Sequence, residues 1–214
     1  VFFRLSMCNL TCKGFASEDS PHGCDSYISW SIKNKMTFNE IFEYFEEHKL
    51  VDKLRDGAIF KLTGGEPMVQ QKQLLKFIKA FVYKYDFHPI IDFETNATIK
   101  PHEDWVEKFH ASFTTSPKLT SNGDPEKRSY KPEVLKWHRE AGSGFKFVIS
   151  SDKDIDEIWR KYVDDETVRV PKNRIWFMPC SGSRNEHVEK APAVAEYAKA
   201  MNVNFSPRLH LLIW

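Results

Sequence analysis

The sequence predicts an α/β fold, with residues 1–214 forming a single domain built on a parallel sheet. Short apolar segments of strand length alternate along the chain with segments that carry apolar residues at helical spacing. Polar residues directly follow most of the strand-like segments, and sites assemble at the carboxyl ends of strands in parallel α/β folds. Periodicity does not decide between an open sheet and a partial barrel.

The first half of the chain supplies three expected strands and two helices. A capping box, Thr37 followed three positions later by Glu40, opens the first helix, and Gly57 ends it. Pro67 suits the first turn of the second helix, which has an apolar face. We expect the strands at residues 1–5, 58–62 and 89–93.

The second half continues the alternation of strands and helices. We expect helices at residues 132–140, 152–162 and 186–201, and strands at residues 109–114, 145–149 and 175–178. The apolar tail at residues 206–214 predicts one more strand.

Composition and charge exclude several classes of protein. The chain has 31 Lys and Arg against 30 Asp and Glu and no basic stripe, so we expect no nucleic-acid partner. No apolar run approaches the roughly 20 residues that span a bilayer, and no signal-peptide pattern is present, so we expect no membrane association. Four cysteines are too few for a disulfide scaffold, which favours a reducing cytoplasm.

Three of the four cysteines are clustered in a loop that follows the first expected strand. Cys8 and Cys12 are four positions apart, and eleven residues separate Cys12 from Cys24. Three thiolates can bind three irons of a 4Fe–4S cluster and leave the fourth iron open to a substrate or cofactor. A zinc site with His22 as the fourth ligand, or three unrelated buried thiols, also fits the pattern. Cys180 is interpreted as a free thiol near the site.

Three further polar motifs follow strands and are expected to share one rim of the fold. Taken singly, each is a plain turn or a solvated loop. They are Thr63-Gly64-Gly65-Glu66-Pro67, Glu94-Thr95-Asn96 and Ser116-Pro117-Lys118.

Together these motifs resemble the radical S-adenosylmethionine (SAM) enzymes and, within them, the 7-carboxy-7-deazaguanine synthase family. The resemblance also rests on the cysteine loop with its Cys24-Asp25-Ser26 continuation, and on the segment Ser206-Pro207-Arg208-Leu209-His210. Two departures are visible. Phe15 stands where the superfamily usually has its third cysteine, and the family's N-terminal Gln-Gly-Glu segment is expected to lie before Val1.

The resemblance implies an incomplete parallel (β/α)6-type barrel and a ring-contracting lyase. Such an enzyme converts 6-carboxy-5,6,7,8-tetrahydropterin to 7-carboxy-7-deazaguanine with loss of ammonia, in queuosine-type biosynthesis. A 4Fe–4S cluster cleaves SAM to a deoxyadenosyl radical, which abstracts hydrogen from ring carbon 6 with the assistance of Mg²⁺.

The resemblance also implies a role for each matching residue. The cluster ligands are Cys8, Cys12 and Cys24, and the magnesium ligand is Ser26. The SAM contacts are Asp25, Gly64, Gly65, Glu66, Ser116, Pro117, Lys118, Met178 and Pro179. The substrate contacts are Arg4, Thr63, Glu94, Asn96 and His210, and the catalytic residues are Arg4, Ser26 and His210.

The expected partners are a small-molecule pterin, an electron donor such as flavodoxin or ferredoxin, and a second copy of the chain in a homodimer. Two alternatives stay open at this point. One is another radical SAM enzyme, such as a glycyl-radical activase. The other is a non-enzymatic zinc domain with three cysteines and one histidine.

Overall fold

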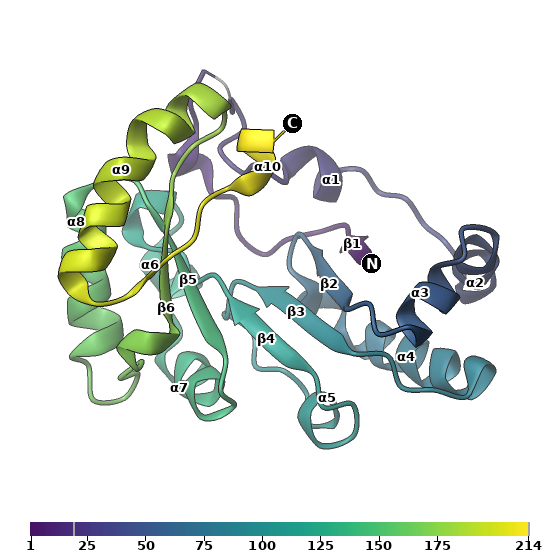
Figure 1. The fold of residues 1–214 in the computed structure, drawn as a ribbon. Helices are drawn as coiled ribbons and strands as arrows, with labels where there is room; N and C mark the ends of the chain where they lie inside the picture. Colours follow the sequence, from purple (N-terminus) through teal and green to yellow (C-terminus); the bar gives the residue numbers. More distant parts are fainter. Residues whose placement is uncertain (19, 214) are drawn as a thin grey trace.

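A computed structural model describes residues 1–18 and 20–213 of the chain. Within these residues seven strands form one parallel sheet in chain order, so β1 and β7 are its two edges and the sheet is not closed. Figure 1 shows the sheet curving like an open trough. This arrangement confirms the expected parallel α/β fold. The strands are β1 (Phe2–Leu5), β2 (Phe60–Gly64), β3 (Ile91–Thr95), β4 (Ser112–Thr115), β5 (Gly144–Ile149), β6 (Ile175–Pro179) and β7 (Asn204–Phe205).

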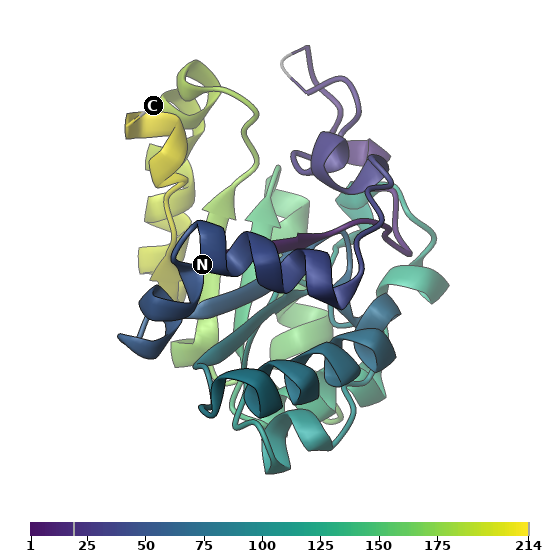
Figure 2. The same ribbon diagram turned by 90° about the vertical axis from the view of Figure 1, so that its right-hand side faces the viewer.

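The longer helices lie along the outer side of the curved sheet, while the cysteine loop and the C-terminal α10 rise together on the other side (Figures 1 and 2). The helices are α1 (Tyr27–Ser31), α2 (Phe38–Glu47), α3 (Leu50–Arg55), α4 (Gln71–Tyr85), α5 (Asp104–Glu107), α6 (Glu126–Ser129), α7 (Pro132–Glu140), α8 (Asp152–Ile158), α9 (Arg184–Met201) and α10 (Leu209–Ile213). Short 3₁₀ turns at Lys13–Phe15, Pro67–Gln70, Thr120–Asn122 and Lys172–Arg174 and a π-helical segment at Trp159–Val163 complete the chain.

The hydrophobic core lies between the sheet and its outer helices. Alternate strand residues point to opposite faces of a sheet, and in β3, β5 and β6 every second residue is buried. One group of buried side chains packs under α2, α3 and α4, and a second packs under α8 and α9. The strand residues in these groups include Phe60, Leu62, Phe93, Phe113, Phe145, Phe147 and Phe177.

The inner face of the sheet is polar and carries paired charges. Lys61 pairs with Asp92 on the neighbouring strand, and Ser112 Oγ donates to Asp92 Oδ1 at 2.7 Å. Glu94 accepts a hydrogen bond from Thr63 Oγ1 at 3.1 Å and lies 3.4 Å from Lys146 Nζ. Lys61, Asp92, Glu94 and Lys146 are partly exposed, so their polar groups are accessible to polar ligands.

The expected helix between Thr37 and Gly57 is interrupted. The capping box of Thr37 and Glu40 is present, but α2 ends at Glu47 and α3 begins at Leu50. Lys49 between them has a φ of 53°, in the left-handed region, and this conformation breaks the helical path. The helices α1, α5 and α6 were not predicted, because they are too short to show a clear helical period.

The expected C-terminal strand was wrong. Pairing with β6 runs through β7 to Ser206, whose N–H donates to the Phe177 carbonyl oxygen at 2.9 Å. Pro207 has no N–H with which to continue the ladder, and the apolar residues after it form α10 instead. A short apolar run fits a strand and a helix equally well, which explains the error. Trp214, at the end of the expected strand, lies outside the described residues.

Within the described residues, none of the helices is both long enough and apolar enough to cross a membrane.

Candidate active site

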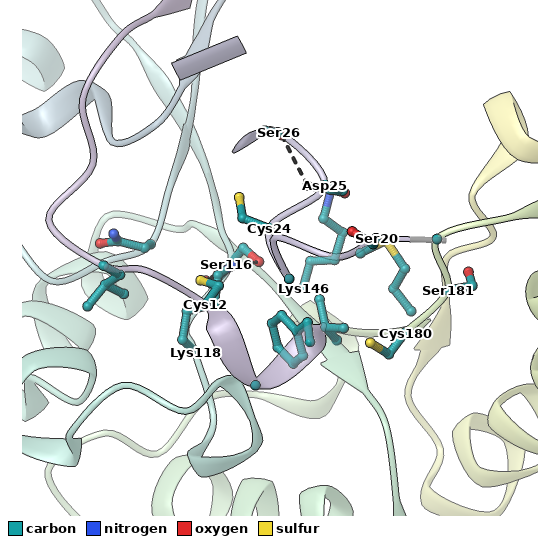
Figure 3. A pocket seen from close by; sticks show the side chains of 18 of the residues that line it. Cys12, Ser20, Cys24, Asp25, Ser26, Ser116, Lys118, Lys146, Cys180 and Ser181 are labelled. Atoms are coloured by element: carbon teal, nitrogen blue, oxygen red, sulfur yellow. Dashed lines mark hydrogen bonds between the residues drawn. The ribbon is translucent and has the colours of Figure 1, made fainter. Parts of the chain in front are cut away.

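One pocket of about 370 Å³ is lined by the cysteine loop and by residues at the carboxyl ends of the central strands (Figure 3). Of the residues expected at the site, those lining it are Cys8, Cys12, Cys24, Asp25, Ser26, Thr63, Gly64, Gly65, Glu94, Asn96, Ser116, Lys118 and Met178. The expected residues outside the lining are Arg4, Glu66, Pro117, Pro179 and His210. The structure therefore brings the cysteine loop and all three strand-end motifs together around one cavity, and Arg208 adds a residue of the C-terminal motif.

The turn after β2 holds the beginning of the cysteine loop in place. The Gly65 N–H donates to the Leu5 carbonyl oxygen and the Glu66 N–H donates to the Met7 carbonyl oxygen, both at 2.9 Å. A Cβ atom on Gly65 would lie 2.0 Å from the Met7 oxygen and 3.1 Å from Cys8 Cβ. Only glycine permits this close approach, which places Cys8 against the turn.

Each of the three clustered cysteines has an N–H group directed at its sulfur. The Leu10 N–H lies 3.5 Å from Cys8 Sγ, Asn122 Nδ2 lies 4.0 Å from Cys12 Sγ, and Trp30 Nε1 lies 3.3 Å from Cys24 Sγ. Among the described residues, no such donor reaches Cys180 Sγ, although Cys180 lines the same pocket. Hydrogen bonds to sulfur are typical of thiolates that bind iron–sulfur clusters, so the three sulfurs fit a cluster and Cys180 is set apart from them.

Burial favours the protonated thiols of Cys8 and Cys12. Burial raises the pKa of Cys8, and it raises the pKa of Cys12 to about 12 even though Lys118 acts in the opposite direction. Metal ions and clusters bind the thiolate, so binding here has to release protons.

The geometry gives no support to the zinc alternative. The His22 ring stacks on Tyr27 with the ring centroids 4.1 Å apart. In residues 1–18 and 20–213, no three His, Cys, Asp or Glu side chains lie close enough together to hold a single metal ion. The ligands of a 4Fe–4S cluster lie farther apart, because each thiolate binds a different iron.

Lys118 is the central cation of the pocket. Its Nζ donates to the carbonyl oxygen and to the Oγ of Ser116, each at 2.8 Å, so the Ser116-Pro117-Lys118 turn folds back on itself. The positive charge acts on both Cys8 and Cys12, whose pKa values it lowers against the effect of burial. An ammonium group in this position is suited to pair with a carboxylate.

Glu66 lies behind the residues that line the pocket and has a structural role there. Its side chain is fully buried and accepts hydrogen bonds from the Met68 N–H, Thr95 Oγ1 and the Asn96 N–H at 3.0, 2.7 and 2.6 Å. Burial raises the pKa of this carboxyl group, and the three donors act in the opposite direction. Asn96 in turn donates to Asn9 Oδ1 at 2.9 Å. The network joins the ends of β2 and β3 to the cysteine loop.

The inner-face carboxylate of Glu94 is ionised. Burial alone would raise its pKa, but Lys146 and Lys61 hold the pKa below its usual value. Lys146 was not predicted from the sequence, although its alternation with the buried Phe145 and Phe147 on β5 places it on the same face as Glu94.

At the rim of the pocket, residues from the N-terminal and C-terminal parts of the chain contact one another. Arg208 pairs with Asp25 and donates to the Ser181 carbonyl oxygen, while Ser26 Oγ donates to Asp25 Oδ1 at 3.1 Å. The motif containing Arg208 was noted in the sequence for His210, which instead lies exposed on α10.

Arg4 lies opposite Thr63 in the register of β1 and β2 and is exposed. It is therefore beside the polar face, outside the pocket lining.

Comparison with known proteins supports the same chemistry. The 7-carboxy-7-deazaguanine synthase of Hyperthermus butylicus is 25% identical over 219 residues, covering all of this chain and 83% of the relative. The synthase of Pyrobaculum aerophilum is 26% identical over 218 residues, covering all of this chain and 85% of the relative. The synthase of Koribacter versatilis is 34% identical over 82 residues, which cover 38% of this chain and 30% of the relative.

A family model described as a 4Fe-4S single cluster domain matches residues 1–107 of the 214. The matched half contains the three clustered cysteines and the glycine turn after β2. The chain therefore belongs to the 4Fe-4S single cluster domain family.

Proposed function

We propose that this chain is a radical SAM lyase that converts 6-carboxy-5,6,7,8-tetrahydropterin to 7-carboxy-7-deazaguanine with loss of ammonia. The observation that carries the proposal is the convergence of three thiols, each with an N–H donor at its sulfur, on a polar pocket at the strand ends. The names of relatives that align over the whole chain support the choice of reaction.

Cys8, Cys12 and Cys24 would hold the 4Fe–4S cluster, with one iron left for SAM. When bound, the cluster and SAM supply the one-electron chemistry that generates a deoxyadenosyl radical. The protein's part is to orient the bound groups and to exclude water from the pocket.

The SAM-binding groups would come from the strand ends. The turn Gly64-Gly65-Glu66 would contribute backbone contacts to the SAM amino group. Lys118 would pair with the SAM carboxylate, and its bonds to Ser116 orient its ammonium group. Asp25, Pro117, Met178 and Pro179 would complete the contacts.

The pterin would bind against the polar inner face. Thr63, Glu94 and Asn96 present hydroxyl, carboxylate and amide groups that match the edge of a pterin ring. Arg4 and His210 would reach the substrate carboxylate from the rim, and Lys146 offers a cation inside the pocket. Ser26 would provide a hydroxyl ligand for Mg²⁺, which takes few protein ligands and keeps waters or substrate oxygens.

We also propose that residues 1–214 act as one domain in a homodimer in the cytoplasm, where thiols stay reduced. A flavodoxin or ferredoxin would supply the electron. The exposed apolar side chains of Ile28, Ile32 and Met36, on and after α1, support contact with another protein surface.

The deciding experiment is anaerobic turnover. The protein is reconstituted with iron and sulfide, supplied with SAM, a reductant, Mg²⁺ and 6-carboxy-tetrahydropterin, and the products are identified by mass spectrometry. We expect 7-carboxy-7-deazaguanine and ammonia, and a lower rate when Mg²⁺ is omitted. SAM cleavage without any change in the pterin would point to another radical SAM enzyme, such as a glycyl-radical activase. A colourless protein that binds zinc and ignores SAM would contradict the proposal.

Replacing Trp30 by phenylalanine should lower the reduction potential of the cluster. The substitution keeps an aromatic ring but removes the N–H that lies 3.3 Å from Cys24 Sγ. A donor at a cluster sulfur stabilises the more negative, reduced state, so its loss makes reduction harder. A redox titration followed by electron paramagnetic resonance measures the shift, and Tyr83→Phe on the exposed face of α4 serves as the control. An unchanged potential would show that the donor is irrelevant to the cluster.

A further inference from the structure

A buried carboxylate from a distant part of the chain holds the backbone of the cysteine loop. Asp124 follows the 3₁₀ turn Thr120–Asn122 after β4, and its side chain is 1% exposed. The Cys12 N–H donates to Asp124 Oδ2 at 2.8 Å. The Thr11 N–H donates to Oδ2 at 2.9 Å and to Oδ1 at 3.1 Å, and Thr11 Oγ1 donates to Oδ1 at 3.1 Å. The carboxylate thus binds two consecutive backbone amides of the loop.

We refer to the hydrogen bonds from the Thr11 and Cys12 backbone to Asp124 as the Asp124 clamp. The conformation of Cys12 explains why this clamp is needed. Cys12 has φ 51° and ψ 33°, in the left-handed region that residues with a side chain rarely adopt. A backbone in this region persists only where the surrounding structure holds it. The two amide bonds to Asp124 fix the residue before Cys12 and Cys12 itself, and so fix the direction of its thiol.

The two loops also pack backbone against backbone. A Cβ atom on Gly14 would lie 2.2 Å from the Ser121 carbonyl oxygen and 2.6 Å from the Asn122 carbonyl carbon. Asn122 Nδ2 donates to Asp124 Oδ2 at 3.3 Å and also lies 4.0 Å from Cys12 Sγ. The segment from Ser121 to Asp124 therefore supports the Cys12 backbone and reaches the Cys12 sulfur at the same time.

We propose that Asp124 is a positioning residue that presets Cys12 for cluster binding before the cluster arrives. The inference rests on the proposed role of Cys12 as a cluster ligand and adds a residue outside the cysteine motif. Asp124 is separated from Cys12 by 112 positions in sequence.

Both oxygens of the Asp124 side chain have to act as acceptors for the loop amides to be held. Both oxygens of Asp124 accept hydrogen bonds from the loop, so an asparagine would turn its amide nitrogen toward an N–H donor. Arg128 Nη1 lies 3.7 Å from Asp124 Oδ1 and balances the charge, and Arg128 also donates to the Asn9 carbonyl oxygen. The substitution Asp124→Asn therefore disrupts the clamp with almost no change in side-chain volume.

Two measurements test the clamp, one without the cluster and one with it. In the metal-free protein, hydrogen exchange of the peptide containing Thr11 and Cys12 should be slow in the wild type and fast in Asp124→Asn. After reconstitution, the lifetime of the cluster in the presence of an iron chelator should be roughly tenfold shorter or more in the variant, the size of effect seen on removing groups that support metal ligands. Thr11→Val, which removes only the hydroxyl donor, should shorten the lifetime less.

Asp104→Asn is the matched control. Asp104 on α5 is also a buried carboxylate, paired with Lys79 at 2.9 Å and Lys108 at 2.7 Å, but it lies outside the pocket lining. This variant should lose thermal stability and keep the cluster lifetime of the wild type. The proposal is overturned if Asp124→Asn keeps wild-type exchange protection or cluster lifetime, or if Asp104→Asn shortens the lifetime equally. A wild-type protein that takes up no cluster would instead contradict the proposed cofactor. The proposed clamp would still be tested, because hydrogen exchange is measured in the metal-free protein.

Discussion

Replacing Cys24 by alanine should abolish cluster retention and reduce turnover below roughly 1% of the wild type. Loss of a group that merely supports a metal ligand typically costs 10–100-fold, and loss of a ligand costs more. Cys180→Ala should keep the iron content and the visible absorption of the wild type, because Cys180 is outside the group of sulfurs that receive N–H donors. Iron and sulfide analysis after anaerobic reconstitution measures both variants.

This pair of variants discriminates between two choices of third ligand. Cys24 comes late in the loop, after the insertion that begins at Lys13, and Cys180 lines the same pocket from the end of β6. If Cys180→Ala lost the cluster while Cys24→Ala kept it, Cys180 would be the third ligand, and the assignment made here would be wrong.

Replacing Glu66 by glutamine should destabilise the protein and weaken SAM binding together. The carboxylate accepts three hydrogen bonds in a fully buried position, and a glutamine would face the Asn96 N–H with its own donor. An unsatisfied buried polar group costs about 1–3 kcal/mol, which corresponds to a fall in melting temperature of roughly 2–4 °C per kcal/mol for a chain of this size.

The weaker SAM binding follows from the position of Glu66. The turn that Glu66 anchors also carries Gly65, which lies against Cys8. Differential scanning calorimetry and equilibrium binding of SAM measure the two effects, with Glu133→Gln on the exposed side of α7 as the control. A variant with the wild-type melting temperature would show that the three donors find other partners.

The strands of the outer core were readily predicted from sequence because their buried residues are large and apolar. Phe60 and Leu62, or Phe145 and Phe147, identify a strand whatever lies between them. The tail was not predicted, since Leu209 to Ile213 is apolar apart from His210, and only Pro207 and the end of the β6 ladder decide between strand and helix. The break at Lys49 depends on a single left-handed residue, which has no strong sequence signal outside glycine and asparagine.

The site was predictable where its residues form short motifs at the ends of strands. Lys118 and the glycine turn were found in this way. Asp124 and Arg208 were missed as functional residues because their importance lies in contacts made over 112 and 183 positions of the chain. No local pattern marks such residues, so only the folded arrangement reveals them.

The division of each central strand between an apolar outer face and a polar inner face has a consequence for how this fold diversifies. Polar and buried aromatic residues alternate along these strands, as in Lys61 beside Phe60, Asp92 beside Phe93 and Lys146 beside Phe147. The inner residue of each pair lies on the polar face of the sheet, and the outer residue packs in the core. A substitution at an inner position changes which ligands the inner face of the sheet can bind, without creating a cavity in the hydrophobic core on the outer face. New specificities can therefore arise on this scaffold by single steps, while the outer positions keep the chain foldable.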